Sequence, residues 1–151
     1  MVIAYVLPGK SGDYKVVQLE LKGQEHIRFG DGDKGHSGCL THILEIEEGR
    51  FGLSPRFTGG PIRFTDLKYA SELGLTDVQT YETVQDHGSE RQIPALVGSG
   101  YRVLGMGNAH IFVPDKSIIF FGRSLSYTIG LDKDQIERFR RQIPEWKIEV
   151  K

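Results

Sequence analysis

A histidine in a glycine-rich turn is the residue of this chain best suited to catalysis. Residues 30–38 read GDGDKGHSG, with His36 near the end, and apolar residues at helical spacing follow at Leu40, Ile43 and Leu44. This pattern predicts a loop that enters a helix near His36 and stops near Gly49. N–H groups at a helix start attract anions, and neutral imidazole is a nucleophile or general base near pH 7. The segment predicts that His36 meets a phosphoryl group; an exposed loop histidine without a role is the alternative.

A second segment that could hold an anion lies in the last third of the chain. Residues 121–128 read FGRSLSYT, a short hydroxyl-rich turn between a predicted buried strand and a predicted helix. Alternating N–H groups in such a turn can form an anion-binding nest. A plain connection from strand to helix is the alternative.

Other motifs are weaker, and no metal or cofactor is predicted. Asp31-Gly32-Asp33 resembles the start of a calcium loop, but His36 and His42 stand where that loop needs glycine and glutamate. A spacing of six also places these two histidines on different faces of a helix. Cys39 is favoured as a small packing residue over a reactive thiol at a helix start. His26, His87 and His110 have no supporting constellation, and Gly105-x-Gly107 lacks the rest of a dinucleotide fingerprint.

A lysine shares a strand face with apolar residues. Between Tyr14 and Leu21 the residues alternate, so that Lys15, Val17 and Leu19 share one face and Val16 and Gln18 the other. Lys15 therefore lies at the end of a strand, either as a functional cation or as a lysine whose stem packs at a sheet rim.

Periodicity predicts the remaining elements. Asp132 is the predicted N-cap of a helix that ends before Pro144, with Gln135 at the capping-box position. A short helix is predicted over 66–73, inside a partly irregular insertion at roughly 50–100. The predicted strands are 2–7, 14–21, 25–29, 101–104, 109–113, 117–121 and 146–150.

This order predicts an α/β (α+β) fold: a mixed sheet flanked by two main helices, in a single domain over residues 1–151. Its net charge of −1 disfavours a nucleic-acid binder. Arg138, Arg140 and Arg141 are assigned to the C-terminal end of a helix, where cations complement the dipole. One cysteine, no leader-like N-terminus and no long apolar stretch predict a cytoplasmic protein without a membrane partner.

Taken together, these segments resemble the janus/ocnus family of protein histidine phosphatases. The most specific match runs from Leu104-Gly105-Met106-Gly107 through Asp115-Lys116 to Gly122-x-Ser124-x-x-Tyr127, similar to the family's L-G-G-G … D-K … G-Y-S-M-A-Y pattern. In the N-terminal half, Lys15 opens a strand and Glu25-x-Ile27-Arg28 precedes His36, as in the family. The resemblance covers about two-thirds of the chain and leaves out much of residues 50–100.

The resemblance implies a metal-independent phosphatase without a cofactor that removes phosphate from phosphohistidine, and sometimes phospholysine, in protein partners. By this resemblance His36 is the catalytic histidine, as nucleophile or general base, and Lys15 stabilises the phosphate. N–H groups around Ser124 and Ser126 hold the phosphoryl oxygens. The full phosphate-binding set is Arg28, Ser37, Asn108, Ser124, Leu125 and Ser126.

Several residues depart from the family pattern. Asn108 stands where the family carries an arginine, Ser126 replaces an alanine, and Thr128 replaces a glycine. With the insertion, these changes keep two other functions open. One is a non-catalytic module that binds a phospho-ligand or a protein; the other is a phosphatase for a small phosphorylated metabolite.

Overall fold

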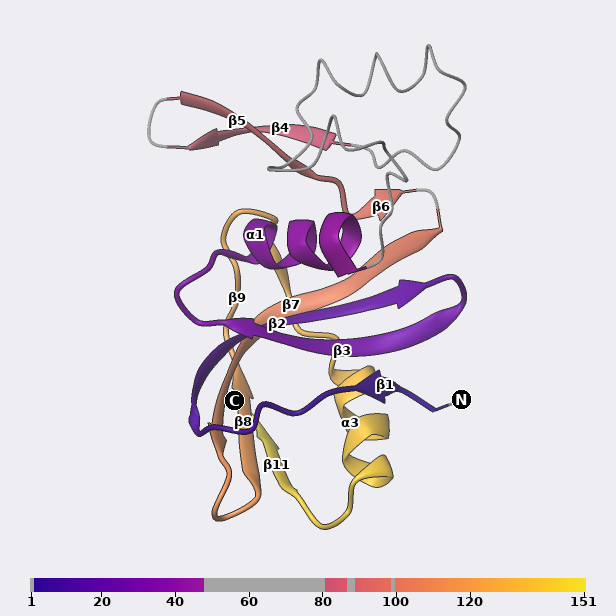
Figure 1. Ribbon diagram of the computed structural model, residues 1–151, viewed down its shortest axis with the longest axis vertical. Coiled ribbons are helices and arrows are strands. Elements are labelled where there is room, and N and C mark those ends of the chain that lie inside the picture. Colours follow the sequence, from indigo (N-terminus) through magenta and orange to yellow (C-terminus); the bar gives the residue numbers. More distant parts are fainter. Residues whose placement is uncertain (1, 48–80, 87–88, 99) are drawn as a thin grey trace. The chain divides into compact units, whose positions relative to one another are not determined.

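The structure is a computed structural model that describes residues 2–47, 81–86, 89–98 and 100–151 (Figure 1). The chain divides into two compact units: residues 1–39 together with 101–151, and residues 40–100. The helix predicted over 66–73 and most of the predicted insertion lie outside the described residues.

The first unit is built on a mixed sheet, which confirms the predicted fold class. Its central strands are antiparallel, whereas each edge strand runs parallel to its neighbour. The sheet order is β1 (Ala4–Tyr5), β3 (Gln24–Asp31), β2 (Gly12–Leu21), β7 (Tyr101–Phe112), β8 (Ser117–Phe121) and β11 (Lys147–Val150).

Strands β2 and β3, which were predicted over 14–21 and 25–29, pair as an antiparallel hairpin. Lys22 and Gly23 connect them with φ angles of 49° and 81°, and two left-handed residues in a two-residue loop match the twist of the flanking strands. The first predicted strand, 2–7, is wrong in length, because only Ala4 and Tyr5 pair with β3.

Strand β7 contradicts the prediction of two strands separated by a glycine turn. It runs unbroken through Gly105 and Gly107, with one register shift against β2. These glycines are needed because another part of the chain crosses them. A Cβ at Gly107 would lie 2.6 Å from the Leu131 side chain, and one at Gly105 would lie 2.5 Å from the backbone N of Asp132.

Helix α3 (Lys133–Gln142) covers one face of this sheet. The Asp132 side chain accepts from the N–H groups of Asp134 and Gln135, which confirms the predicted N-cap. The helix and the sheet together bury the main core: Ile3, Val16, Ile27, Ala109, Ile111, Ile118, Phe120, Ile136, Phe139, Ile143 and Ile148. Ile136 and Phe139 are the residues of the helix itself that face this core.

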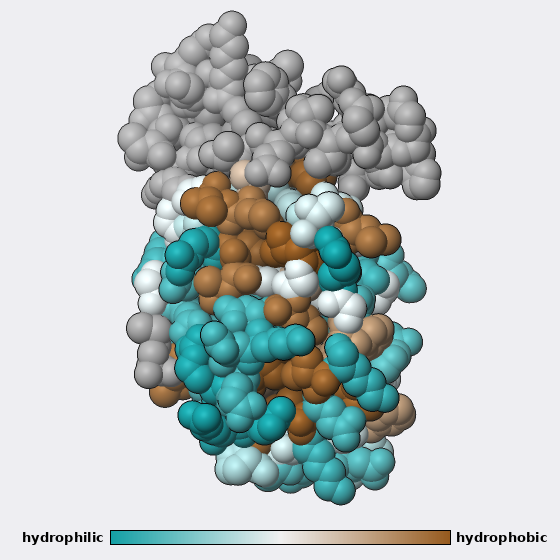
Figure 2. All heavy atoms as spheres, turned by 180° about the vertical axis from the view of Figure 1, so that it is seen from behind, coloured by the Kyte–Doolittle hydropathy of each residue, from teal (hydrophilic) through white to brown (hydrophobic). Residues whose placement is uncertain are grey.

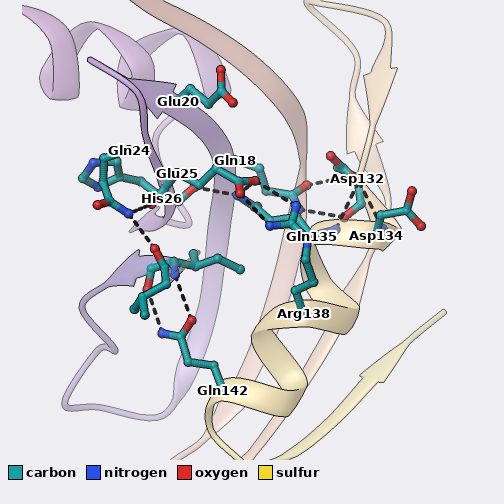
Figure 3. A network of polar contacts seen from close by, with 12 residues as sticks. Gln18, Glu20, Gln24, Glu25, His26, Asp132, Asp134, Gln135, Arg138 and Gln142 are labelled. Carbon is teal, nitrogen blue, oxygen red and sulfur yellow. Dashed lines mark hydrogen bonds and ion pairs between the residues drawn. The ribbon is translucent and has the colours of Figure 1, made fainter.

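A layer of polar contacts ties α3 to β2 and β3 (Figure 3). The amide of Gln18, fully buried, accepts from the N–H of Asp132 and donates to its carbonyl, both at 2.8 Å. Gln135 donates toward the Glu25 carboxylate and the His26 carbonyl, at 3.4 Å each. The reciprocal half of the predicted capping box is therefore wrong, because Gln18 takes the N–H that Gln135 was expected to bind.

The arginines of α3 each have an acidic partner. Arg138 donates two hydrogen bonds to Glu25, at 2.5 and 2.8 Å. Arg140 and Arg141 pair with Glu137 on the helix surface, at 3.3 and 3.9 Å. Figure 2 shows hydrophobic and hydrophilic residues side by side on one face of the molecule. The exposed large apolar side chains among the described residues include Val2, Val6, Val97, Phe112 and Leu125.

The second unit contains an antiparallel hairpin of β4 (Tyr81–Asp86) and β5 (Ser89–Pro94), followed by the short β6 (Val97–Gly98). Helix α1 (His36–Thr41) begins in the first unit, and a π-helical segment, η1 (His42–Glu47), continues it in the second. Leu40, Ile43 and Leu44 are buried. None of the described helices is long and apolar enough to span a membrane.

Candidate functional site

His36 begins α1, as predicted, but it is not an exposed loop residue. Only 7% of its surface is accessible, and its Nε2 lies 2.6 Å from the carbonyl oxygen of Gly107. A carbonyl can only accept, so Nε2 carries the proton in this contact. The neutral ring therefore keeps its lone pair on Nδ1, which has no hydrogen-bond partner among the described residues. The contact selects the tautomer in which Nδ1 can act as nucleophile or base.

The surroundings of His36 favour the neutral ring. Burial lowers its pKa below the ordinary value of 6.5, the hydrogen bond to Gly107 opposes this shift, and the charge of Lys15 lowers the pKa further. An imidazole with such a pKa is uncharged at pH 7. The geometry thus provides a histidine that is neutral and oriented before any ligand arrives.

His36 contacts β7 just beyond the point where its pairing with β8 ends. Pairing between β7 and β8 ends at Asn108 and Phe121, and Gly107 is the next residue of β7 beyond that pair. Its carbonyl accepts from His36 at this point. The site therefore lies where the sheet loses a strand, and all of its residues described below belong to the first unit.

Lys15 and Asn108 lie opposite each other on β2 and β7. The Nζ of Lys15 donates to Oδ1 of Asn108 at 3.3 Å, and both side chains are half-buried. Lys15 also lies close enough to His36 to lower its pKa electrostatically. The predicted pair of His36 and Lys15 is thus brought together, with Asn108 beside it.

The hydroxyl-rich turn starts next to Asn108. Gly122 has a φ of 75°, and a Cβ there would lie 2.7 Å from Nδ2 of Asn108. Both the left-handed backbone and this close approach require glycine. The turn then forms a small two-stranded ribbon, β9 (Arg123–Ser124) and β10 (Ile129–Gly130), which replaces the plain connection to the helix.

Within the ribbon, the predicted phosphate ligands differ in exposure. Ser124 is fully buried, and its Oγ accepts from the N–H of Tyr127 at 3.3 Å. Leu125 is 83% exposed, and Ser126 is exposed as well. Among the described residues, no hydrogen bond joins Ser124, Leu125 or Ser126 to His36 or Lys15. Their place in the site rests on the contact between Gly122 and Asn108.

Arg28 and Ser37 lie on elements that border the site. Arg28 is half-buried on β3, and strand alternation puts it on the same sheet face as Lys15, since its partner Val17 shares that face. Ser37 is buried in the first turn of α1. The structure therefore places Arg28 two register pairs along the sheet from Lys15, and Ser37 next to His36.

Cys39 is a packing residue, as favoured from the sequence. It is buried, and a Cβ at Gly30 would collide with its Sγ. Burial raises the pKa of its thiol, although the charges of Lys34 and Lys15 oppose the shift. The thiol is therefore protonated at neutral pH, and its role is to hold the first turn of α1 over Gly30 of β3.

One arrangement was missed by the sequence analysis. Nδ1 of His110, on β7, contacts the carboxylate of Asp13, on β2, and the His110 ring stacks on Phe121 with centroids 4.5 Å apart. Asp13 and His110 are register partners, one alternation step from Lys15 and Asn108. Both residues lay on or beside predicted strands, but their pairing needed the register between segments about a hundred residues apart.

No protein-family model matches the chain, and no curated protein matches it significantly. The resemblance to the janus/ocnus family therefore stays a prediction. Among the described residues, no three His, Cys, Asp or Glu side chains lie close enough to hold a metal ion.

Proposed function

We propose that this protein is a metal-independent phosphatase that removes phosphate from phosphohistidine in proteins, with His36 as its central residue. The observation that supports this most strongly is the hydrogen bond from Nε2 of His36 to Gly107, which leaves the lone pair of a neutral ring on Nδ1. The adjacent cation, Lys15, is suited to the oxygens of a phosphoryl group.

Two routes are compatible with this arrangement. Nδ1 of His36 attacks phosphorus and forms a covalent intermediate that water then hydrolyses, or it takes a proton from an attacking water. In both routes Lys15 stabilises the charge of the phosphoryl oxygens, and N–H groups of the turn that follows Gly122 add donors. The P–N bond of a phosphoramidate is weak, so positioning and charge stabilisation supply most of the acceleration.

The first test is hydrolysis of a phosphohistidine peptide in the presence of EDTA, with wild type beside His36→Gln. Because His36 is buried, the thermal unfolding of both proteins is measured as well. His26→Gln is the matched control, since His26 lies on the same sheet but four residues along β3 from Gly30, the partner of Lys15. We expect turnover in wild type and His26→Gln, and none in a folded His36→Gln. Normal turnover by His36→Gln would contradict the proposal.

A second candidate function is a binding module without catalysis. It is favoured by Asn108, an uncharged residue that occupies one hydrogen bond of Lys15 and stands where the resembling family carries a cation. This module would bind inorganic phosphate or a phosphopeptide without turnover. Parallel assays on sugar phosphates distinguish both functions from a phosphatase for small metabolites.

A further inference from the structure

His110 is a second histidine whose ring is held in place on the sheet face that carries Lys15. Its Nδ1 contacts the Asp13 carboxylate, and one side of its ring is covered by Phe121. Because the carboxylate only accepts, the proton of the neutral ring is on Nδ1. Nε2 is then the atom that is open to a ligand, and the side chain keeps 43% of its surface accessible.

His36 and His110 lie on opposite sides of Lys15 and Asn108 along β7. Along β7, His36 contacts Gly107, Lys15 contacts Asn108, and His110 stands two residues further. Successive residues rise about 3.3 Å in a strand, so His110 is roughly 7 Å from Asn108 along β7. The two histidines therefore flank the pair of Lys15 and Asn108, with His36 towards one end of the strand and His110 towards the other.

In-line displacement at phosphorus requires such an arrangement. The attacking group and the leaving group lie on opposite sides of the phosphoryl group. If Lys15 holds the phosphoryl oxygens and His36 serves the attacking side, the leaving group points along β7 towards His110. Among the described residues that pair with this part of β7, the ionisable side chains on the same sheet face are Asp13 and Lys15 on β2, while Phe121 on β8 supplies an apolar surface.

We infer that His110, positioned by Asp13 and Phe121, is the general acid that protonates the leaving imidazole of the substrate. This inference rests on the proposed function and assigns it a substrate whose leaving group has a basic ring nitrogen. When the ring of His110 carries a second proton, its Nδ1–H faces the Asp13 carboxylate, so Nε2–H is the proton that is available to the ligand.

The proton and electron transfers balance. Phosphohistidine is basic at the ring nitrogen that does not carry phosphorus, and this nitrogen takes the proton of Nε2–H of His110. The P–N bond then breaks, its electron pair stays on nitrogen, and a neutral imidazole departs. A water oxygen bonds to phosphorus and loses a proton to Nδ1 of His36. One water is consumed, and the two histidines return to their starting states by proton exchange with solvent.

The test uses two substrates that differ only in their need for a proton. Phosphoimidazole has a leaving group that benefits from protonation, whereas phospho-4-nitroimidazole has one that departs without it. For His110→Gln we expect turnover of phosphoimidazole to fall about 100-fold, because general acid catalysis contributes at least that much. Turnover of the nitro compound is expected to stay within about 3-fold of wild type.

Two further variants separate this role from a structural one. Asp13→Asn, at a side chain that is 75% exposed, is expected to show the same selectivity at about a tenth of wild-type rate on phosphoimidazole. His26→Gln should leave both rates unchanged. Equal rate losses on both substrates, or none on either, in a folded His110→Gln would overturn the inference. A wild type that hydrolyses neither these compounds nor the phosphohistidine peptide would overturn the proposed function, and the inference with it.

Discussion

Two polar regions lie on opposite faces of the same sheet, and their hydrogen bonding differs. Beneath α3, Glu25 receives two hydrogen bonds from Arg138, and Gln18 uses both ends of its amide on Asp132. On the other face, His36 and Lys15 each have one hydrogen bond in the described structure.

This difference separates polar groups that hold the fold together from those that can bind a ligand. Groups that already bind each other through several hydrogen bonds have few donors or acceptors left for a ligand. Removing one member of such a pair leaves a buried group without its partner. His36, whose Nδ1 has no hydrogen-bond partner among the described residues, and Lys15, which has one neutral acceptor there, can each take a further partner. Within the described part of the chain, the layer under α3 has one exception, because Oε1 of Gln135 is buried there without a hydrogen-bond partner.

Apart from the variants of His36 and His110, the largest effect on turnover is expected when Lys15 is changed to alanine. Loss of a group that stabilises transition-state charge costs about 100-fold, or about 2.7 kcal/mol. The free energy of unfolding should change by less than about 1 kcal/mol, because the side chain has a single hydrogen bond at 3.3 Å. Steady-state kinetics, phosphate titration and urea unfolding measure these quantities. Lys10→Ala is the control, and phosphate affinity equal to that control would place Lys15 among the structural residues.

Arg138→Ala is expected to give the opposite pattern. It leaves the buried carboxylate of Glu25 without its cation, at a cost of about 2 kcal/mol in unfolding free energy, less than for a fully buried pair because the Arg138 side chain is 42% exposed. Turnover should be unchanged below the unfolding transition. Arg141→Ala, at a surface pair with a 3.9 Å separation, is the matched control. A turnover loss as large as that of Lys15→Ala would break the distinction between the two faces.

The pH dependence of this stability difference has a defined sign. The hydrogen bonds from Arg138 hold the pKa of Glu25 below its ordinary value of 4.5, although burial acts in the opposite direction. A lowered carboxyl pKa contributes stability above the unfolded pKa, and this contribution is lost as the pH falls. The gap between wild type and Arg138→Ala should therefore close as the pH falls through 4.5 to the lower folded value. A gap that stays constant to pH 3 would show that packing, and not charge, causes the loss.

Turnover should have an acidic limb that reports His36. Because burial, and secondarily Lys15, lower the pKa of His36, the ring stays neutral and active down to a pH below 6.5. The midpoint of this limb in kcat/KM is expected below 6.5 in wild type. In Lys15→Gln this midpoint should rise but stay below 6.5, because burial of the ring, which is the larger cause of the lowered pKa, is unchanged. A midpoint above 6.5 in wild type would contradict the assignment of this limb to His36.

Local patterns were enough to predict much of the fold. The alternation of β2, the apolar run of β8 and the Asp132 cap of α3 are encoded within a few residues, and the structure has them where they were expected. Gly105 and Gly107 led to the wrong prediction of two separate strands, because the requirement for glycine at these positions comes from a distant part of the chain. They admit Leu131 and Asp132, which follow more than twenty residues later, and a turn was the simpler local interpretation.

The candidate site was predictable in its residues and not in its contacts. His36 and Lys15 could be singled out by residue type and position. The burial of His36 and its bond to Gly107 depend on where β8 ends, and the contact of His110 with Asp13 depends on the register of β2 with β7. Register between distant strands is set by the packing of the whole sheet face and is not visible in either strand alone.

The smallest effect is expected from Asn108→Ala. This variant tests whether Asn108 belongs to the residues that hold the fold together or to those that bind the ligand. Asn108 accepts from Lys15 and lies against Gly122, so it could either restrain the cation or contribute to the ligand site. A single hydrogen bond to a charged donor at 3.3 Å, half-buried, contributes about 1 kcal/mol or less. If Asn108 only restrains Lys15, its removal weakens phosphate binding by no more than about 5-fold and leaves kcat unchanged. A loss in kcat as large as that of Lys15→Ala would instead make Asn108 part of the group that stabilises the transition state.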